Sequence, residues 1–358
     1  MNIETGYSDG KAYVTIEQTQ DVNKNIAVFK LPIDIDFHVN GQVYRKRYWM
    51  TKRSQTFAHE FKQKPTFVNV DPDRILLYEK VEDKTDSEYL YQYKNGKNFV
   101  NRYEAFEALK NKNNAQSKNV IMLALNDPHW KIRKMAISYC DKNDVLAAGE
   151  IAKKLTSDTD PRVRSEALSY LGQTGDEKYF GQIEKMVEKE KNPSIKSNGL
   201  VSLFLLDPGS FQKSVPKYSK TDNREIINTI AQILVESDLT KDLSFFESNW
   251  KKMDNYDAIS FFNMYGLAAM KLDAMNQGRA LMQFKEIGLS DSSIWRRVAV
   301  AKTMSDMKKV YEAQAKDADN TSDRNHLQQA ASQVRGFLSQ MLKKEKDPDL
   351  VKLLESLL

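Results

Sequence analysis

The chain has few of the residues that disulfide-stabilised and membrane proteins depend on. Its 358 residues include one cysteine, Cys140, so no disulfide can form within the chain. Cys140 stands at an apolar position of a helical pattern, which favours a small buried core residue. No apolar run approaches the about eighteen residues that cross a bilayer, and the first residues lack the basic head and apolar stretch of a signal peptide. The sequence predicts a soluble chain without a membrane span. The compartment stays open between bacterial cytoplasm and, if a longer parent carries a leader, periplasm.

Histidine is also scarce, and none of the four has the spacing of a metal site. A zinc hydrolase helix carries two histidines four residues apart with a glutamate between them. His59-Glu60 begins this motif, but Gln63 stands where the second histidine should be, and the stretch has a strand pattern. The remaining histidines are predicted at surface or turn positions: His38, His129 and His326.

Motifs of other enzyme classes are missing as well. The sequence contains no GxSxG elbow, no phosphate-binding glycine-rich loop and no GxGxxG turn. The apolar context of Cys140 argues against an activated nucleophile. We therefore assign no catalytic, cofactor-binding or metal-binding residue and expect no cofactor in this chain.

Basic residues are not strongly clustered in any part of the sequence. The chain has 54 basic and 49 acidic residues, a net charge of +5. The densest basic group, at 45–47 with Lys52 and Arg53, is typical of the solvated face of a hairpin rather than a phosphate site. A nucleic-acid partner is not favoured, because such proteins usually concentrate their positive charge in a stripe.

The first eighty residues have the pattern of short strands. Apolar and polar residues alternate from Phe29 to His38, which predicts a buried face and a solvent-exposed face carrying Asp34 and Asp36. A turn is expected at 21–25, and further strands at 13–18, 43–50, 55–61, 66–70 and 74–79. Together these features predict a small antiparallel β-sandwich.

A polar, aperiodic stretch at 82–88 indicates a boundary between domains. It is followed by Tyr89, Tyr91 and Tyr93, whose spacing cannot place all three on one face of a helix. We interpret them as packing a linker helix onto the sandwich. The expected domains are a β-sandwich at 1–81, a linker and docking helix at 82–101, and a helical repeat domain at 102–358.

The helical domain shows an internal repeat. The frame that contains Asp158 recurs 31 residues earlier at Asp127 and 32 residues later at Glu190. A period in this range is typical of stacked helix pairs, of which about seven or eight fit the length. Polar breaks are expected at 207–209, 221–223, 276–278 and 319–323, and a final helix at 352–358.

In the sharpest copy, at 155–176, four apolar residues share one helical face. Pro161 suits the first turn of a helix, where its missing N–H costs nothing, and small Ala167 lets neighbouring helices approach. Asp158 and Arg164 are spaced to pair as a structural ladder. The series resembles the HEAT repeat, so the fold class expected is a β-sandwich followed by a HEAT-like α–α superhelix.

The β-rich part has a resemblance of its own. Its ordered series, at 14–20, 29–35, 55–57 and 69–77 with Trp49 and Lys64-Pro65, resembles the β-sandwich that follows the catalytic domain in gluzincin zinc aminopeptidases. These are the alanyl and puromycin-sensitive type, peptidase family M-one, in which a helical domain comes next.

The resemblance implies that this chain is a non-catalytic C-terminal segment, excised from a longer parent, that covers the active-site cleft. The zinc-binding HExxH helix would lie upstream and has no counterpart here. Expected partners are the catalytic domain in cis, the parent's peptide substrate and a protein partner on the concave helical surface. The alternatives are a stand-alone HEAT-repeat scaffold for protein binding and, less favoured, a nucleic-acid binder.

Overall fold

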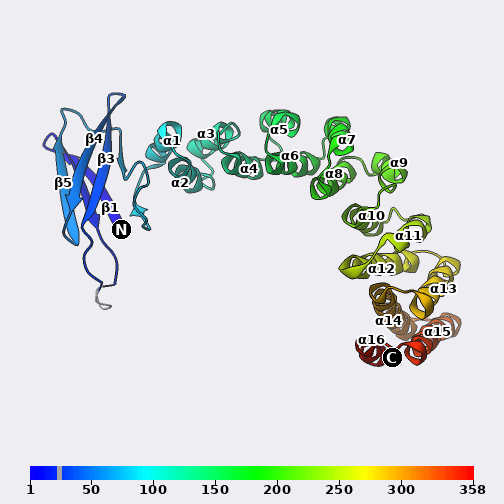
Figure 1. The fold of residues 1–358 in the computed structure, drawn as a ribbon. Coiled ribbons are helices and arrows are strands. Elements are labelled where there is room, and N and C mark those ends of the chain that lie inside the picture. Colours follow the sequence, from blue (N-terminus) through cyan, green and yellow to red (C-terminus); the bar gives the residue numbers. More distant parts are fainter. Residues whose placement is uncertain (22–25) are drawn as a thin grey trace. The chain divides into compact units, whose positions relative to one another are not determined.

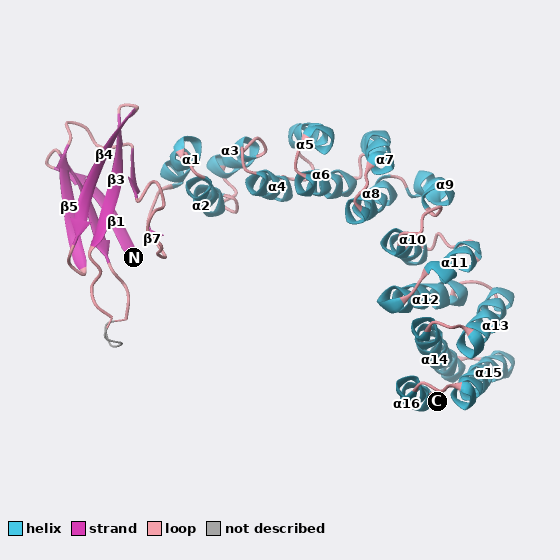
Figure 2. Ribbon diagram, viewed as in Figure 1, coloured by secondary structure: helices cyan, strands magenta, loops and turns pink. Residues whose placement is uncertain are grey.

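The computed structural model of the protein describes residues 1–21 and 26–358, with strands first and helices after them (Figure 1). Residues 22–25 of the turn predicted at 21–25 lie outside the described residues. The described residues form two compact units, Met1–Ile151 and Ala152–Leu358. The order of strands and helices confirms the predicted fold class of a β part followed by an all-α part (Figure 2).

Two sheets make up the β part of the first unit. The strands are β1 (Asn2–Ser8), β2 (Lys11–Glu17), β3 (Leu31–Val39), β4 (Gln42–Met50), β5 (Ser54–Glu60), β6 (Phe67–Val70) and β7 (Val81–Glu82). One sheet has the order β5-β2-β1-β7 and the other β4-β3-β6, and every pairing except the parallel β1–β7 pair is antiparallel. Asn40 and Gly41 both have positive φ, which suits the tight β3–β4 turn. The core holds ten buried residues: Ile3, Ala12, Val14, Ile16, Ile33, Ile35, Phe37, Met50, Phe57 and Val70.

Two residues of the predicted exposed face of β3 are buried. Asp34 and Asp36 are only 8% and 7% exposed, because Arg47 and Arg45 lie opposite them on β4. Arg47 Nε donates to Asp34 Oδ1 at 2.6 Å, and Arg45 Nε donates to Asp36 Oδ1 at 2.7 Å. Hydrogen bonding from Arg47 lowers the pKa of Asp34 below its ordinary value. Two members of the predicted basic group, Arg45 and Arg47, are thus bound to carboxylates. The apolar alternation begins in β3 and not at Phe29, which is exposed.

The strand predicted at 74–79 does not form. Asp71 Oδ1 accepts a hydrogen bond from the Ile75 amide at 3.0 Å, and its Oδ2 accepts one from the Leu76 amide at 3.1 Å. Asp71 and Arg74 both have positive φ, so the chain turns sharply where the strand was expected to start. From Ile75 the segment has a bend at Leu76 and, among the described residues, pairs with no strand before β7.

Sixteen α-helices follow in the described residues, which agrees with the predicted number of pairs. They are α1 (Asp86–Asn95), α2 (Phe99–Leu109), α3 (Ala115–Ala124), α4 (Trp130–Tyr139), α5 (Val145–Ser157), α6 (Pro161–Gln173), α7 (Phe180–Lys189), α8 (Pro193–Leu206), α9 (Pro208–Tyr218), α10 (Arg224–Glu236), α11 (Ser244–Asn249), α12 (Asn255–Met270), α13 (Ala274–Ser290), α14 (Ile294–Asp317), α15 (Thr321–Lys344) and α16 (Pro348–Leu357). In the second unit the even-numbered helices contact one another in series from α6 to α16.

Capping residues decide where several helices begin. Asp347 accepts hydrogen bonds from the amides of Asp349 and Leu350, so α16 starts at Pro348 and not at the predicted residue 352. Asp273 likewise caps α13 through the Asn276 amide. The break predicted at 276–278 is therefore wrong, because these polar residues form the first turns of a helix.

Small residues set the spacing between α6 and α8. A Cβ atom on Gly172 of α6 would lie 2.7 Å from Ser202 Cα of α8. The Ser202 hydroxyl donates to the Leu168 carbonyl at 2.9 Å across this contact. The two helices therefore approach each other too closely at Gly172 for any side chain.

Candidate functional site

The described residues contain no group of three or more histidine, cysteine or acidic side chains able to hold a metal ion. No helix among them has the length and apolar character needed to span a membrane. His59, the start of the incomplete zinc motif, lies on β5 against the rings of Phe37 and Phe61. The unusual chemistry of the chain lies instead where the sandwich meets its first helices.

The remaining histidines lie apart from one another. His38 is half-buried on β3 between the rings of Phe67 and Tyr91, and burial lowers its pKa, so its predicted surface or turn position is wrong. His129 caps the start of α4, and His326 is exposed on α15.

Cys140 is a half-buried cap at the end of α4 rather than a core residue. Burial raises the pKa of its thiol to about 12. The thiol stays protonated at neutral pH, which leaves it without the thiolate that a nucleophile requires.

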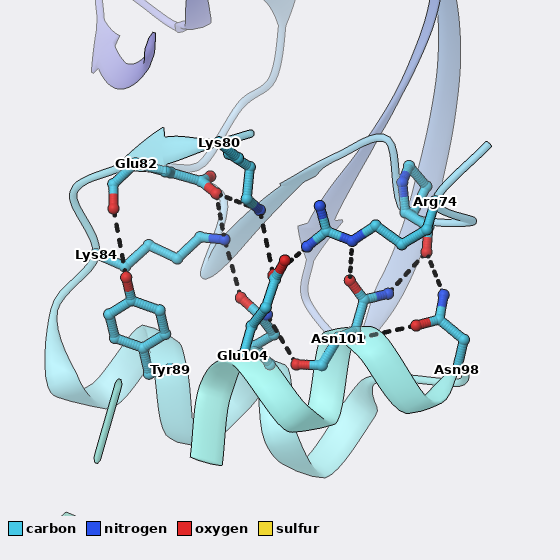
Figure 3. Close-up of polar contacts among 10 residues, drawn as sticks. Arg74, Lys80, Glu82, Lys84, Tyr89, Asn98, Asn101 and Glu104 are labelled. Carbon is cyan, nitrogen blue, oxygen red and sulfur yellow. Dashed lines mark hydrogen bonds and ion pairs between the residues drawn. The ribbon is translucent and has the colours of Figure 1, made fainter. Parts of the chain in front are cut away.

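A buried charge cluster joins the sandwich to the first helices (Figure 3). The ammonium nitrogens of Lys80 and Lys84 lie 2.7 and 2.8 Å from Glu82 Oε2. The side chains of Lys80, Glu82 and Lys84 are 10%, 3% and 4% exposed. Residues 82 and 84, predicted to be part of a polar boundary, thus point into the protein.

The environment of this cluster shifts two pKa values. Burial lowers the pKa of Lys84 to about 8. Burial also opposes the charge on Glu82, but the two lysines outweigh it and leave the pKa of Glu82 below its ordinary value. Lys84 Nζ also donates to Gln92 Oε1 at 2.9 Å and lies 4.9 Å from the ring centroid of Phe67. One ammonium group therefore contacts a strand end, α1 and β6.

A second set of contacts fixes α2 against the segment that follows β6 (Figure 3). Arg74 forms an ion pair with Glu104, and its Nε donates to Asn101 Oδ1 at 3.1 Å. The side-chain amides of Asn98 and Asn101 both donate to the Pro72 carbonyl, at 2.8 and 2.7 Å. Because side chains take up these buried polar groups, the helix pair is held in one register on the sandwich.

The tyrosines predicted to dock the linker helix divide their contacts. The Tyr91 hydroxyl lies 3.3 Å from His38 Nδ1 on the sandwich, and Tyr89 donates to the Glu82 carbonyl at 3.3 Å. Tyr93 faces the helices instead, where it donates to Asp127 Oδ2 at 2.9 Å. Docking through Tyr89 and Tyr91 agrees with the expectation, whereas Tyr93 joins α1 to the repeats.

A polar cavity of about 180 Å³ lies beside Tyr91, between β3, β6 and the end of α1. His38 and Lys97 line it, and Asn69 reaches it with a side-chain oxygen that has no hydrogen-bond partner among the described residues. The volume is below the range of about 300–1,000 Å³ typical of small-molecule sites. It suits a few ordered waters better than a substrate.

The predicted ladder residues of the repeat make contacts of a different kind. Arg164 Nη1 donates to the main-chain carbonyl of Asp158 at 3.1 Å, and its ion pair, at 3.6 Å, is with Glu190. Arg102 similarly donates to Asp127 Oδ2 at 2.8 Å. Each arginine thus bonds an acidic residue about 25 positions later, so the contacts connect successive helix pairs and are structural.

An outward apolar row runs beside the charge cluster. Ile75, Leu77 and Val81 are 70%, 106% and 66% exposed, while the intervening Leu76 and Tyr78 pack on the sandwich core. The sequence pattern at 74–79 predicted a strand, but it did not indicate which side of the segment is buried. Here the ionic side chains lie inside and large aliphatic side chains lie outside, the reverse of the usual arrangement.

No protein family and no curated protein matches the chain. Among solved structures it is similar to aminopeptidase A of Legionella pneumophila in complex with aspartic acid, at 12% identity and a TM-score of 0.41, over 99% of this chain and 48% of that one. It is also similar to the Escherichia coli protein YibA, at 12% identity and a TM-score of 0.44, over 70% of this chain and 93% of that one. Both likenesses are distant, and the chain spans about half the length of the aminopeptidase.

Proposed function

We propose that this chain is the non-catalytic C-terminal segment of a zinc-dependent aminopeptidase, which covers the active-site cleft and shapes peptide access. The support is the order of its parts, a β-sandwich and then helix pairs, together with the β-strand residues that resemble the sandwich of gluzincin aminopeptidases. In this proposal zinc is bound by an upstream domain, and the partners are that domain in cis and the parent's peptide substrate.

The main structural support for this proposal is the outward apolar row. Three large aliphatic side chains of this segment, Ile75, Leu77 and Val81, are exposed to water. The main-chain nitrogen of Met1 lies 2.5 Å from the carbonyl oxygen of Glu79 in this segment. A domain joined to Met1 would therefore begin beside this row. Covering each of these side chains would contribute about 1.5–3 kcal/mol.

The buried charge cluster between the sandwich and α1 suits a segment that must keep a fixed conformation over an active-site cleft. Lys80, Glu82 and Lys84 are ionised groups that stay buried only while the sandwich and α1 remain together. Separation would expose these charges to water and break the hydrogen bond from Lys84 to Gln92 on α1. Such a junction favours a fixed angle between the sandwich and its first helices over free hinge motion.

The test compares this chain with the longer protein encoded from the nearest in-frame upstream start. Both would be incubated with zinc and alanine p-nitroanilide. We expect release of nitroaniline by the longer protein, lost on chelation, and none by this chain. Zinc-dependent turnover by this chain alone would contradict the proposal, as would a stop codon and ribosome-binding site directly upstream of Met1.

The apolar row gives a second readout in the longer protein. Ile75→Asp with Leu77→Asp should lower the melting temperature of the longer protein, because the upstream domain would then cover two unpaired charges. Val145→Asp with Leu146→Asp on α5 is the matched control, since these residues are also exposed, at 70% and 78%. Equal effects of the two changes would remove this support.

A stand-alone protein-binding scaffold is the second candidate. The even-numbered helices of the second unit expose large aliphatic side chains, among them Leu205 on α8, Leu267 on α12 and Val310 on α14. A protein partner that packs on these helices would cover such exposed apolar side chains. An independent start signal at Met1, with recovery of a stable complex that loses its partner on Leu205→Asp, would favour this candidate over the first.

A further inference from the structure

We propose that a groove between α5 and α7 binds an acidic peptide segment that carries an apolar side chain. This inference is independent of the aminopeptidase proposal. The groove has a volume of about 550 Å³, within the range of about 300–1,000 Å³ typical of ligand sites. Its lining comes from α5, α6, α7 and the residues after α7: Leu155, Thr156, Arg164, Gln182, Lys185, Met186, Lys189, Glu190 and Lys191.

The groove is formed in advance and has apolar parts. Gln182 Nε2 donates to the Ala152 carbonyl at 2.6 Å, which fixes α7 against α5. Met186 is half-buried and supplies accessible apolar lining, and Leu155 packs fully buried beneath it. The unbranched thioether of methionine adapts to different apolar side chains. An apolar residue of a partner would therefore find a matching site.

Charges on α7 are separated by sign into two rows. Glu184 and Glu188 stand four residues apart and turn toward Lys217 of α9, which lies 3.8 Å from Glu184 and forms an ion pair with Glu188. Lys185 and Lys189 form the second row, also four residues apart on one face, and both line the groove. The acidic row is thus neutralised within the protein, and the basic row is directed at the groove.

Lysines supply the available positive charge at this groove. In the part of the chain that the structure describes, Lys185, Lys189 and Lys191 form no ion pair, and all three are exposed. The guanidinium of Arg164 is engaged by Glu190 at 3.6 Å and by the Asp158 carbonyl. Charge complementarity therefore calls for carboxylates on the partner, positioned to reach the three lysines.

A peptide fits this groove better than a nucleic acid. Single-stranded nucleic acids bind through bases stacked on aromatic rings, and no aromatic residue among those described lines the groove. Its apolar lining instead suits an aliphatic side chain next to carboxylates. The partner is therefore a protein segment in which glutamate or aspartate flanks a leucine-like residue.

The test measures fluorescence anisotropy of a labelled peptide with glutamates on both sides of a central leucine. Lys185→Glu with Lys189→Glu should weaken its binding by about tenfold or more, because two attractive contacts become repulsive. Lys302→Glu with Lys352→Glu is the control of equal charge, on α14 and α16, and should have little effect. A peptide with serine in place of the central leucine should also bind more weakly.

Three results would overturn the proposal. The first is no binding of the glutamate–leucine peptide to the unmodified chain. The second is an equal loss in the Lys302/Lys352 control, which would show attraction to net charge alone. The third is tighter binding of an oligothymidine, lost in the Lys185/Lys189 variant, which would assign the groove to nucleic acid. Circular dichroism of each variant establishes that the helices are intact.

Discussion

The charge cluster between the sandwich and its first helices and the core of the last helices are both buried, but they are stabilised in different ways. The helical core packs Phe246, Phe261, Phe262, Tyr265 and Phe284, each fully buried, with several ring centroids about 5–6 Å apart. The junction instead buries ammonium and carboxylate groups that contact one another. An apolar side chain is stabilised by leaving water, whereas a buried charge is tolerated only while its partner is present.

The largest expected effect lies in the aromatic core. Phe262→Ala should lower the free energy of unfolding by about 4 kcal/mol, because it removes a fully buried ring and leaves a cavity. Urea unfolding followed by tryptophan fluorescence measures this, since Trp250 packs 6.4 Å from the Phe262 ring centroid. Met275→Ala, at a residue 74% exposed on α13, should change it by about 0.5 kcal/mol or less. Similar losses in both variants would contradict the assignment of the core.

The junction should respond to loss of one charge almost as strongly. Glu82→Gln leaves Lys80 and Lys84 buried without their carboxylate and should cost about 3 kcal/mol. Glu79→Gln, three residues away at an exposed position, should cost about 0.5 kcal/mol or less. Changing both lysines to methionine in the Glu82→Gln protein should recover most of the loss. Failure of that recovery would show that packing, not unpaired charge, explains the first result.

The same contrast explains what could be predicted from the sequence. Helix pairs and strands follow from apolar periodicity, so their order and type were predictable. The buried faces of Asp34 and Asp36 were not, because a carboxylate is buried only when an arginine lies opposite, and that depends on strand register. The register of β3 on β4 is a tertiary contact that alternation alone does not contain.

The junction was missed for a related reason. Lys80, Glu82 and Lys84 look like a solvated linker, since charged residues are almost never buried without partners. Gln92, whose side chain accepts from Lys84, comes from α1 and could not be paired with it from sequence spacing. The groove at α7 left a weak signal, two lysines and two glutamates each four residues apart, but its apolar lining depends on how α5 packs.

A third prediction concerns the close packing within the helical unit. Gly172→Ala should cost about 2 kcal/mol, because its Cβ would lie 2.7 Å from the Ser202 main chain, which cannot move aside like a flexible side chain. Gly181→Ala on α7, where nothing lies within 4 Å of the new Cβ, should be neutral or stabilise by about 0.5–1 kcal/mol. Thermal unfolding of the two variants separates steric crowding from helix propensity. Stabilisation by both would show that α6 and α8 are farther apart than described.

The smallest expected effect is a change in how the free energy of unfolding depends on pH. It distinguishes a junction stabilised by charge from one stabilised by packing. The pKa of Lys84 is about 8 in the folded protein and 10.5 ordinarily. Because the folded value is lower, the unfolded chain binds more protons between these values, so this group makes the free energy of unfolding rise with pH there. From about pH 8 to 9 we expect a gain of about 1 kcal/mol in the unmodified chain relative to Lys84→Met, measured by urea unfolding. Lys302→Met should run parallel to the unmodified chain, since Lys302 is exposed. If Lys84→Met ran parallel too, Lys84 would be solvated, and the junction would be held by packing like the helical core.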